Sequence, residues 1–253
     1  MDKTKIKIFI TGANGKLGKP LTSALIKKGY EVFCASRHRG IDILDKERLK
    51  NAIKWFAPNI IIHLATDPKD LENKTEYEGT FNLIQIARKL NIRKIIFASS
   101  CMVYEESALE NHKEDEELYL TLRYPVAKIC AERLISQVNN HLIFRIATVY
   151  DGVNHLPLIR DLGLIYVMFE SHRFKVSYLH IKDFVNAVIY GIDKDLTGTF
   201  NLASFTCQYR DIALSNGVMV IPLCQIYSRG ATKNEIIVTD KIKSKGFKFI
   251  GSM

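Results

Sequence analysis

The sequence predicts an α/β protein built on a doubly wound parallel sheet, followed by a small, shortened α+β lobe. Up to about residue 150, short apolar runs alternate with longer segments whose apolar residues recur at helical spacing. The apolar runs are nearly continuous, as expected of parallel strands that are buried on both faces. This alternation is typical of a Rossmann-type sheet with helices on both sides.

The expected elements follow one another with short connections. The expected strands are 5–11, 30–36, 59–65, 94–99 and 141–146, and the expected helices are 16–28, 45–56, 76–90 and 124–139. Gly29 ends the first helix, Asp45 can cap the second, and Pro58 closes it.

The pattern loosens after about residue 150. Short strands are expected at 176–181, 198–203, 218–222 and 235–239, with a helix at 181–190. The acidic stretch 105–117 is expected to be a solvated loop. We therefore predict a first domain at 1–150 and a smaller lobe at 151–253, with residues of about 177–203 returning to the first domain.

Composition limits the classes of function. The 253 residues carry a net charge of +9, but the lysines are dispersed and no nucleic-acid recognition motif accompanies them. No apolar run approaches the roughly 18 residues that cross a membrane. The five cysteines have no metal-ligand spacing and fit reduced thiols in a cytoplasm. We expect a cytoplasmic protein that binds neither nucleic acid, membrane nor metal.

A glycine-rich turn follows the first strand and precedes the first helix. Gly12 permits a tight turn, Gly15 lets the backbone approach a pyrophosphate, and Gly18 lets helix pack on strand. The free amides of a helix N-terminus then face the anion. The turn predicts dinucleotide binding, and its other candidate contacts are Asn14, Lys16 and Leu17.

The end of the second strand favours NADP(H) over NAD(H), although NAD(H) stays possible. Enzymes that use NAD often have an acidic residue there for the ribose hydroxyls, whereas this chain has Ser36 and Arg37. A serine can donate to a 2′-phosphate, and an arginine can pair with it. The alternative is that Arg37 is an ordinary surface arginine. Asp42 could accept a hydrogen bond from the adenine amino group, beside Ile43.

The third strand ends in residues that would lie along the cofactor. These candidates are Leu64, Ala65 and Thr66. His63 is expected to be a structural strand-end residue, because nothing near it in the sequence completes a metal or catalytic set.

Ser100, Tyr124 and Lys128 form the candidate catalytic set. Their spacing places Tyr124 and Lys128 on one helix face. A phenol with a pKa near 10 is a poor base at neutral pH, and a nearby ammonium with an oxidised nicotinamide would lower that pKa. Tyr124 would exchange a proton with the substrate oxygen that Ser100 orients, and Lys128 would also hold the nicotinamide ribose. A tyrosine and a lysine at this spacing can also be an ordinary helix face.

These motifs together resemble the extended short-chain dehydrogenase/reductase family, in its sugar-nucleotide epimerase, dehydratase and reductase branch. The matching segments, in family order, are 11–18, 63–65, 79–83, 99–104, 124–128, 144–150, 178–185, 198–202 and 241–247. The resemblance implies NAD(P)-dependent chemistry on a nucleotide-diphosphate sugar. It also implies a possible homodimer formed through two helices per subunit, one of them 124–139.

Departures from the family pattern narrow the reaction. Cys101 and Met102 stand where 4,6-dehydratases carry an Asp-Glu pair, so dehydration is not expected. Cys101 with His155 could form an added acid–base pair, or both could simply line the site. Other candidate substrate contacts are Arg123 and Thr148, and further candidate diphosphate ligands are Arg160, Arg173 and Arg210. The stretch 151–176 is shorter than in the family.

Three functions stay open from the sequence. The first is NADPH-dependent reduction of the C4 ketone of a nucleotide-diphosphate 4-keto-6-deoxysugar, with Tyr124 as proton donor. The second is an NAD-dependent nucleotide-sugar 4-epimerase. The third is a regulatory protein that binds a dinucleotide without catalysis, which the shortened substrate lobe would permit.

Overall fold

The computed structural model describes residues 6–67, 69–104, 109–118, 123–150, 175–208, 211 and 234–251. The chain forms two compact units. The first contains residues 1–106, 118–145 and 185–200, and the second contains residues 107–117, 146–184 and 201–253. The assignment of a dinucleotide-binding domain and a substrate lobe to particular residue ranges stays a prediction.

A six-stranded sheet forms the centre of the first unit. Its order is β2 (Glu31–Ala35), β1 (Lys7–Thr11), β3 (Ile60–His63), β4 (Lys94–Ser100), β6 (His141–Ile146) and β9 (Gly198–Leu202). β1 pairs in parallel with both β2 and β3, and β3 pairs in parallel with β4. The chain thus winds outward from β1 in both directions, and the predicted doubly wound Rossmann sheet is confirmed.

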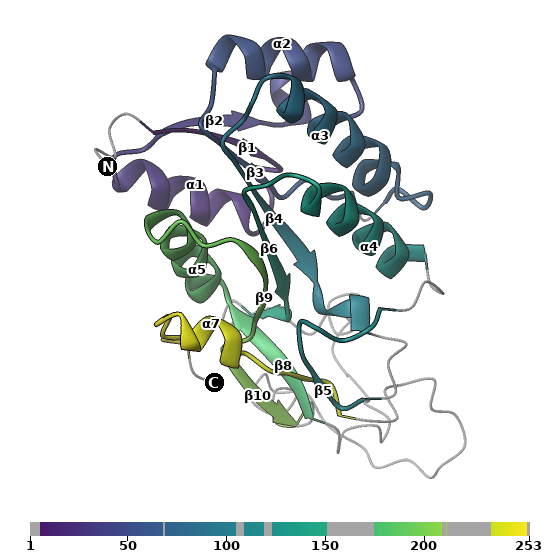
Figure 1. Ribbon diagram of the computed structural model, residues 1–253, viewed down its shortest axis with the longest axis vertical. Helices are drawn as coiled ribbons and strands as arrows, with labels where there is room; N and C mark the ends of the chain where they lie inside the picture. The colour runs from purple at the N-terminus through teal and green to yellow at the C-terminus, as the bar shows by residue number, and fades with distance from the viewer. Residues whose placement is uncertain are drawn as a thin grey trace, which may run out of the picture. The chain divides into compact units, whose positions relative to one another are not determined.

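Helices cover both faces of this sheet (Figure 1). One face carries α2 (Lys46–Phe56), α3 (Thr80–Lys89) and α4 (Arg123–Ser136), and the other carries α1 (Gly18–Lys27) and α5 (Ile181–Asp193). Asp45 caps α2 as predicted, because its Oδ1 accepts a hydrogen bond of 3.1 Å from Arg48 N. Two short 3₁₀ segments, η2 (Arg37–Arg39) and η4 (Cys101–Tyr104), follow β2 and β4 directly.

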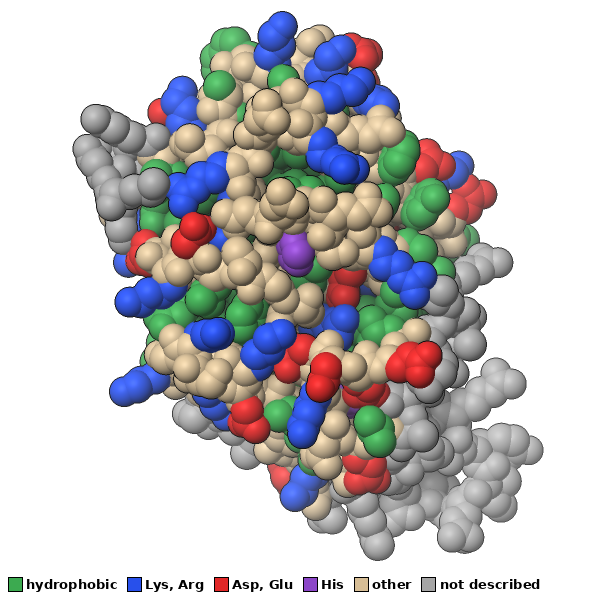
Figure 2. All heavy atoms as spheres, in the orientation of Figure 1, with side chains coloured by type: hydrophobic (Ala, Val, Ile, Leu, Met, Phe, Trp, Pro, Cys, Tyr) green, Lys and Arg blue, Asp and Glu red, His purple; other side chains and the backbone are tan. Residues whose placement is uncertain are grey.

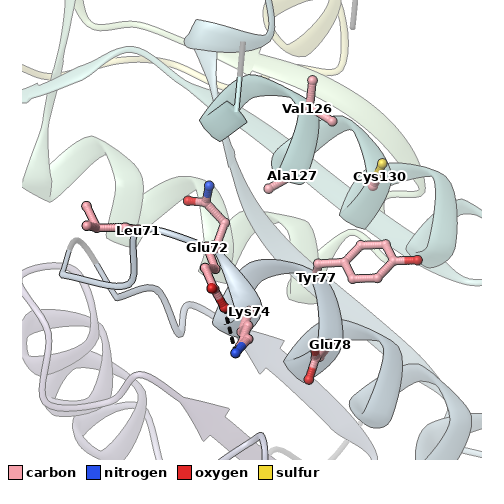
Figure 3. Close-up of a pocket in the computed structure, with 9 residues that line it drawn as sticks. Leu71, Glu72, Lys74, Tyr77, Glu78, Val126, Ala127 and Cys130 are labelled. Atoms are coloured by element: carbon pink, nitrogen blue, oxygen red, sulfur yellow. Dashed lines mark ion pairs between the residues drawn. The ribbon is translucent and has the colours of Figure 1, made fainter. Parts of the chain in front are cut away.

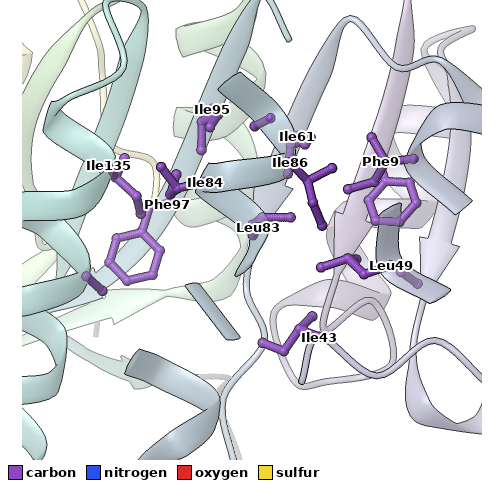
Figure 4. Close-up of a cluster of buried hydrophobic side chains, with 14 of the residues drawn as sticks. Phe9, Ile43, Leu49, Ile61, Leu83, Ile84, Ile86, Ile95, Phe97 and Ile135 are labelled. Carbon is purple, nitrogen blue, oxygen red and sulfur yellow. The ribbon is translucent and has the colours of Figure 1, made fainter. Parts of the chain in front are cut away.

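The main hydrophobic core lies between the sheet and the face that α2, α3 and α4 cover (Figure 4). Phe9, Ile61 and Phe97 project from three neighbouring strands into it. Leu49 and Leu83 meet them from α2 and α3. All five side chains are at most 1% exposed, and the alternate residues of β1, β3 and β4 are buried too, which explains why these inner strands are mostly apolar.

The second unit contains two small sheets. One has the order β10 (Phe205–Gln208), β8 (Lys175–His180) and β7 (Thr148–Tyr150), with β10 antiparallel and β7 parallel to β8. The other pairs β11 (Ile236–Ile237) with β5 (Asn111–His112), and α7 (Asp240–Ser244) follows β11. Among its contacts, buried Asp183 accepts hydrogen bonds from Ile250 N at 2.8 Å and from Gly251 N at 2.9 Å.

Several local expectations were wrong. Part of the acidic stretch 105–117 is strand β5 and not a loop, because its backbone pairs with β11. The expected helix 76–90 begins with a π-helical turn, η3 (Thr75–Gly79), and α4 ends at Ser136 and not at 139. β7, β10 and α7 were not predicted, and the expected strand 218–222 lies outside the described residues.

Charged side chains of both signs are interspersed over the face drawn in Figure 2, where no large patch of one sign is visible. In the described part of the chain, no helix is long and apolar enough to cross a membrane. The described cysteines, Cys34, Cys101, Cys130 and Cys207, are free thiols.

Candidate active site

The glycine-rich turn joins β1 to α1 at the carboxyl edge of the sheet. Gly12 has a φ of +70°, and a Cβ there would lie 2.6 Å from the Leu64 carbonyl carbon. A Cβ on Gly18 would lie 2.3 Å from the Gly12 carbonyl oxygen. These two positions therefore require glycine for the turn itself, whereas Gly15 is exposed and its Cβ would meet little but the Gly12 oxygen, at 3.2 Å.

The segment after β3 runs beside this turn. Leu64 N donates to Thr11 O at 3.1 Å, and Ala65 N donates to Thr11 Oγ1 at 3.4 Å. His63 is fully buried, with Nδ1 2.7 Å from Thr11 Oγ1 and Nε2 2.9 Å from Thr80 Oγ1. Burial lowers the pKa of His63 to about 3, and Lys128 adds to this effect. His63 is therefore neutral and ties two strands to α3.

The end of β2 lies next to the turn, as the cofactor prediction requires. Asn14 Nδ2 donates to Ser36 Oγ at 3.0 Å. Arg37 forms an ion pair with Asp67, with 2.7 Å between Nη1 and Oδ2. Asp42 Oδ1 accepts a hydrogen bond from Leu44 N at 2.9 Å, and the neighbouring Ile43 is buried. This ion pair between Arg37 and Asp67 was not predicted from the sequence.

The three candidate catalytic side chains meet at the end of β4. Ser100 is the last residue of β4, and its Oγ accepts a hydrogen bond of 3.2 Å from Met102 N. The Ser100 side chain also acts on Tyr124 in the first turn of α4, where it lowers the pKa of the phenol. Lys128 lies one turn further along α4, with its Nζ 5.6 Å from the centroid of the Tyr124 ring and 5.1 Å from that of Phe97. Lys128 is 4% exposed.

Burial is the main cause of the pKa shifts of Tyr124 and Lys128. It raises the pKa of Tyr124 to about 12, and the Glu76 carboxylate adds to the increase, while the hydrogen bond with Ser100 opposes it. Burial lowers the pKa of Lys128 to about 8, against the effect of Glu76 and Glu132. The sequence leads us to expect that Lys128 lowers the pKa of Tyr124, but Lys128 is not among the groups that shift this pKa, and burial and Glu76 raise it.

Two buried groups of this site were missed from the sequence. Glu76 is 2% exposed and interacts electrostatically with both Tyr124 and Lys128. Glu132 on α4 is held by Arg145, whose Nη2 lies 2.8 Å from its Oε2, and by Ser99 Oγ at 2.5 Å. Helical periodicity could have indicated that Glu76 is buried, because it falls on the same face of the expected helix as Thr80, Leu83 and Ala87.

The remaining candidate residues are dispersed. Cys101 is half-buried and acts electrostatically on Tyr124, whereas Met102 is 42% exposed. Thr148 is half-buried on β7 in the second unit. Arg123 is the first residue of α4, and its side chain is not described. His155, Arg160, Arg173 and Arg210 lie outside the described residues.

A separate groove of about 550 Å³ lies between the segment 71–78 and α4 (Figure 3). Val126 and Cys130 line it from α4, and Leu71 and Tyr77 line it from the other side. Tyr124 and Lys128 fall on a different face of α4 at 100° per residue. The groove is therefore not the place where Ser100 and Tyr124 meet.

The residues around the turn fit a dinucleotide. The exposed Gly15 leaves the outer side of the turn open to a phosphate. In the first turn of α1, however, Lys19 N already donates to Gly15 O at 3.1 Å, Leu21 N donates to Leu17 O at 3.3 Å, and Pro20 has no N–H group. No group of three potential metal ligands occurs in the part of the chain that the structure describes. The binding and catalytic roles of the individual residues stay predictions.

Comparison with known proteins assigns the family. Residues 8–203 match the NAD dependent epimerase/dehydratase family. The chain therefore belongs to this family of extended short-chain dehydrogenases/reductases, whose members are NAD(P)-dependent oxidoreductases and epimerases. This confirms the resemblance noted from the sequence and the expectation of an NAD(P)-dependent enzyme type.

Three relatives illustrate the range of similarity. A 3-diazoavenalumate denitrifying reductase of Streptomyces sp is 24% identical over 78% of this chain and 75% of that protein. A dTDP-4-dehydrorhamnose reductase of Aggregatibacter actinomycetemcomitans is 30% identical over 51% of this chain and 46% of that protein. The structure of dTDP-4-dehydrorhamnose reductase from Bacillus anthracis in complex with NADP is 20% identical, with a TM-score of 0.80. The match covers 98% of this chain and 95% of that chain.

Proposed function

We propose that this protein reduces the C4 ketone of a nucleotide-diphosphate 4-keto-6-deoxysugar with NADPH. The observation that carries the proposal is the buried Lys128 ammonium 5.6 Å from the centroid of the Tyr124 ring, next to the Ser100 hydroxyl that acts on Tyr124 from the end of β4. This arrangement provides a hydroxyl that can orient a carbonyl oxygen and a phenol that can protonate it. Both lie beyond the end of a strand, close in the sheet order to the glycine-rich turn.

The proton chemistry follows from these groups. A bound reduced nicotinamide dinucleotide would supply the hydride that adds to the carbonyl carbon. As the C=O bond opens, Tyr124 gives its O–H proton to the carbonyl oxygen and becomes a phenolate. Lys128 stabilises this phenolate, and Ser100 holds the oxygen in place. The tyrosine starts protonated at neutral pH, which suits a proton donor.

The cofactor preference rests on Ser36 and Arg37. The Ser36 hydroxyl can donate to a 2′-phosphate, and the Arg37 guanidinium can pair with it. The candidate contacts along the rest of the dinucleotide are the turn residues 12 and 14–18, then Asp42 and Ile43, and the segment 64–66. A relative bound to NADP supports this choice, although the family description names NAD.

The names of the relatives do not single out one reaction. The three described above are named reductases, one of them for a substrate that is not a sugar, whereas others of similar sequence or fold are named epimerases. The chain also spans about half of the Aggregatibacter enzyme that it matches. The nucleotide-sugar substrate therefore rests on the family and on the candidate contacts Cys101, Met102, Arg123, Thr148 and His155.

One observation favours the alternative of an NAD-dependent 4-epimerase. Asp67 holds Arg37 and places a carboxylate where a 2′-phosphate would approach. Like charges repel, so this carboxylate disfavours NADP and is neutral toward NAD. An epimerase would carry tightly bound NAD and turn over with no added cofactor.

The test is consumption of NADPH, compared with NADH, in the presence of nucleotide-linked 4-keto-6-deoxysugars that differ in the nucleobase. We expect one of these compounds to be reduced, with a preference for NADPH. Tyr124→Phe removes the proton donor and should lower kcat by about 10²- to 10⁴-fold, with NADPH affinity unchanged.

Other outcomes have distinct meanings. NADPH binding without reduction of any panel member would contradict the proposed reaction. Activity as a 4-epimerase with bound NAD, and none added, would establish the alternative. Full activity of Tyr124→Phe would overturn the assignment of the proton donor.

A further inference from the structure

A carboxylate is buried beside the candidate catalytic pair without an evident role in the proposed reaction. Glu76 is 2% exposed and lies in the π-helical turn η3, whereas its neighbours Tyr77 and Glu78 are exposed. Its Oε1 accepts a hydrogen bond from Thr66 Oγ1. Its Oε2 is buried and has no hydrogen-bond partner among the described residues. Isolated π-helical turns are frequent at functional sites.

The charges of this region balance only if Glu76 is included. Lys128 and Arg145 are the buried cations, and Glu76 and Glu132 are the carboxylates that act on Lys128. Arg145 uses Nε and Nη2 to bind both oxygens of Glu132, at 2.8 to 3.2 Å. Glu132 is therefore already neutralised, which leaves Glu76 as the unneutralised negative charge near Lys128.

Two other titratable groups around Lys128, His63 and Tyr124, carry no negative charge at neutral pH. His63 on β3 is neutral, because burial lowers its pKa to about 3. Tyr124, one turn away on α4, is protonated at neutral pH. Cys101 on η4 acts on Tyr124, and Tyr104 on the same segment accepts a hydrogen bond from Arg145 Nη1 at 2.8 Å.

We propose that Glu76 is the counterion of Lys128 and the positioning residue that keeps its buried ammonium charged against the Tyr124 ring. A buried ammonium without a partner would lose its proton to avoid the cost of desolvation. Thr66 fixes one oxygen of Glu76 and leaves the other exposed to the electrostatic field of the cation. The catalytic roles of Tyr124 and Lys128 rest on the proposed function, whereas the pairing of Glu76 with Lys128 does not.

The proposal predicts the effect of removing this charge. Glu76 opposes the lowering of the Lys128 pKa and adds to the raising of the Tyr124 pKa. Glu76→Gln keeps the shape of the side chain and an oxygen for Thr66, but it removes the negative charge. Both pKa values should then fall.

The test is a pH titration of the protein with carbon-13-labelled lysine, followed by NMR. The Lys128 signal is assigned by its loss in Lys128→Met and should titrate near its lowered pKa of about 8, below most lysines. In Glu76→Gln we expect this titration to move down by about one pH unit. Glu78→Gln is the matched control, since it removes a charge from an exposed position of the same turn and should leave the titration in place.

The outcomes separate this inference from the proposed function, because the titration needs no substrate. An unchanged Lys128 titration in folded Glu76→Gln would overturn the inference, even if the protein reduces a sugar. If Glu76→Gln does not fold, Glu76→Asp moves the charge by one methylene and should give a smaller downward shift. No shift in Glu76→Asp would then count against the inference.

Catalysis provides a second readout once a substrate is found. The proposed reaction requires charged Lys128 to stabilise the phenolate, so the alkaline limb of the kcat/KM profile should follow the Lys128 pKa of about 8 and should move to lower pH in Glu76→Gln. A residue that only stabilised the fold would lower activity at every pH without moving this limb.

Discussion

At the residue scale, the cofactor preference depends on Arg37 and on the carboxylate beside it. The Arg37 side chain is 65% exposed although it pairs with Asp67. An exposed ion pair of this kind contributes at most about 1 kcal/mol. A 2′-phosphate can therefore compete for the guanidinium, and Asp67 would weaken NADPH binding without preventing it.

We expect Asp67→Asn to tighten NADPH binding by about three- to tenfold, because it frees Arg37 and removes a negative charge from the phosphate site. NADH binding should change by less than about twofold, since NADH carries no 2′-phosphate. Titration of cofactor fluorescence measures both affinities, and Arg37→Ala should reverse the preference. An equal gain for the two cofactors would show that Asp67 does not act at a 2′-phosphate.

The buried pair of Glu132 and Arg145 offers a stability test at the same scale. Glu132→Gln leaves the Arg145 guanidinium buried without its partner charge, and it should lower the free energy of unfolding by about 3 to 5 kcal/mol. Urea denaturation measures the loss. Glu78→Gln, at an exposed position, should change it by less than about 0.5 kcal/mol. Similar small effects of the two variants would mean that the pair contributes little.

At the element scale, the turn between β1 and α1 is fixed by contacts between backbones. Gly12 combines a φ of +70° with a Cβ position 2.6 Å from the Leu64 carbonyl carbon. Gly29, which ends α1, has a φ of +88° but nothing within 4 Å of its Cβ position. A comparison of alanine substitutions at the two positions therefore distinguishes the cost of backbone strain from the cost of a steric clash.

Gly29→Ala should cost about 1 kcal/mol, from the left-handed backbone alone. Gly12→Ala should cost more than this, about 2 to 4 kcal/mol, because the new methyl group must also displace the segment after β3. Thermal denaturation of the two variants gives the comparison. Equal losses would show that the close approach of Leu64 relaxes without cost.

At the scale of the whole molecule, His63 couples the fold to pH. Its pKa is about 3 in the folded protein and near 6.5 in an unfolded chain. Between these values the unfolded chain binds one more proton, so the free energy of unfolding falls as the pH drops below about 6.5. The slope is about 1.4 kcal/mol per pH unit for this one group.

We expect His63→Gln to flatten this dependence between about pH 5 and pH 6.5, above the range in which most carboxylates titrate. Urea denaturation at several pH values measures the slope. His38→Gln, at an exposed position, is the control and should leave the slope as it is. A slope that persists in His63→Gln would assign the pH dependence to other groups.

Sequence patterns predicted the doubly wound sheet because its inner strands, such as β3 and β4, are buried along nearly their whole length and are therefore mostly apolar. They also indicated the glycine turn and the pair of Tyr124 and Lys128, because spacing within one turn or one helix is a local property. The strands of the second unit were harder to predict, since β5, β7 and β10 are short and carry little periodicity. β5 exists because β11, more than a hundred residues later, supplies its hydrogen bonds.

The sequence by itself determined the fold class, the family and the residue types available for chemistry. Tertiary structure alone decided which charges face one another. Glu76, Glu132 and Arg145 come from three separate elements, and their pairing around Lys128 follows from packing and not from spacing. Asp67 likewise reaches Arg37 across thirty residues of chain. Burial then sets the pKa values of Tyr124 and Lys128, because desolvation depends on everything packed around a group and not on its neighbours in sequence.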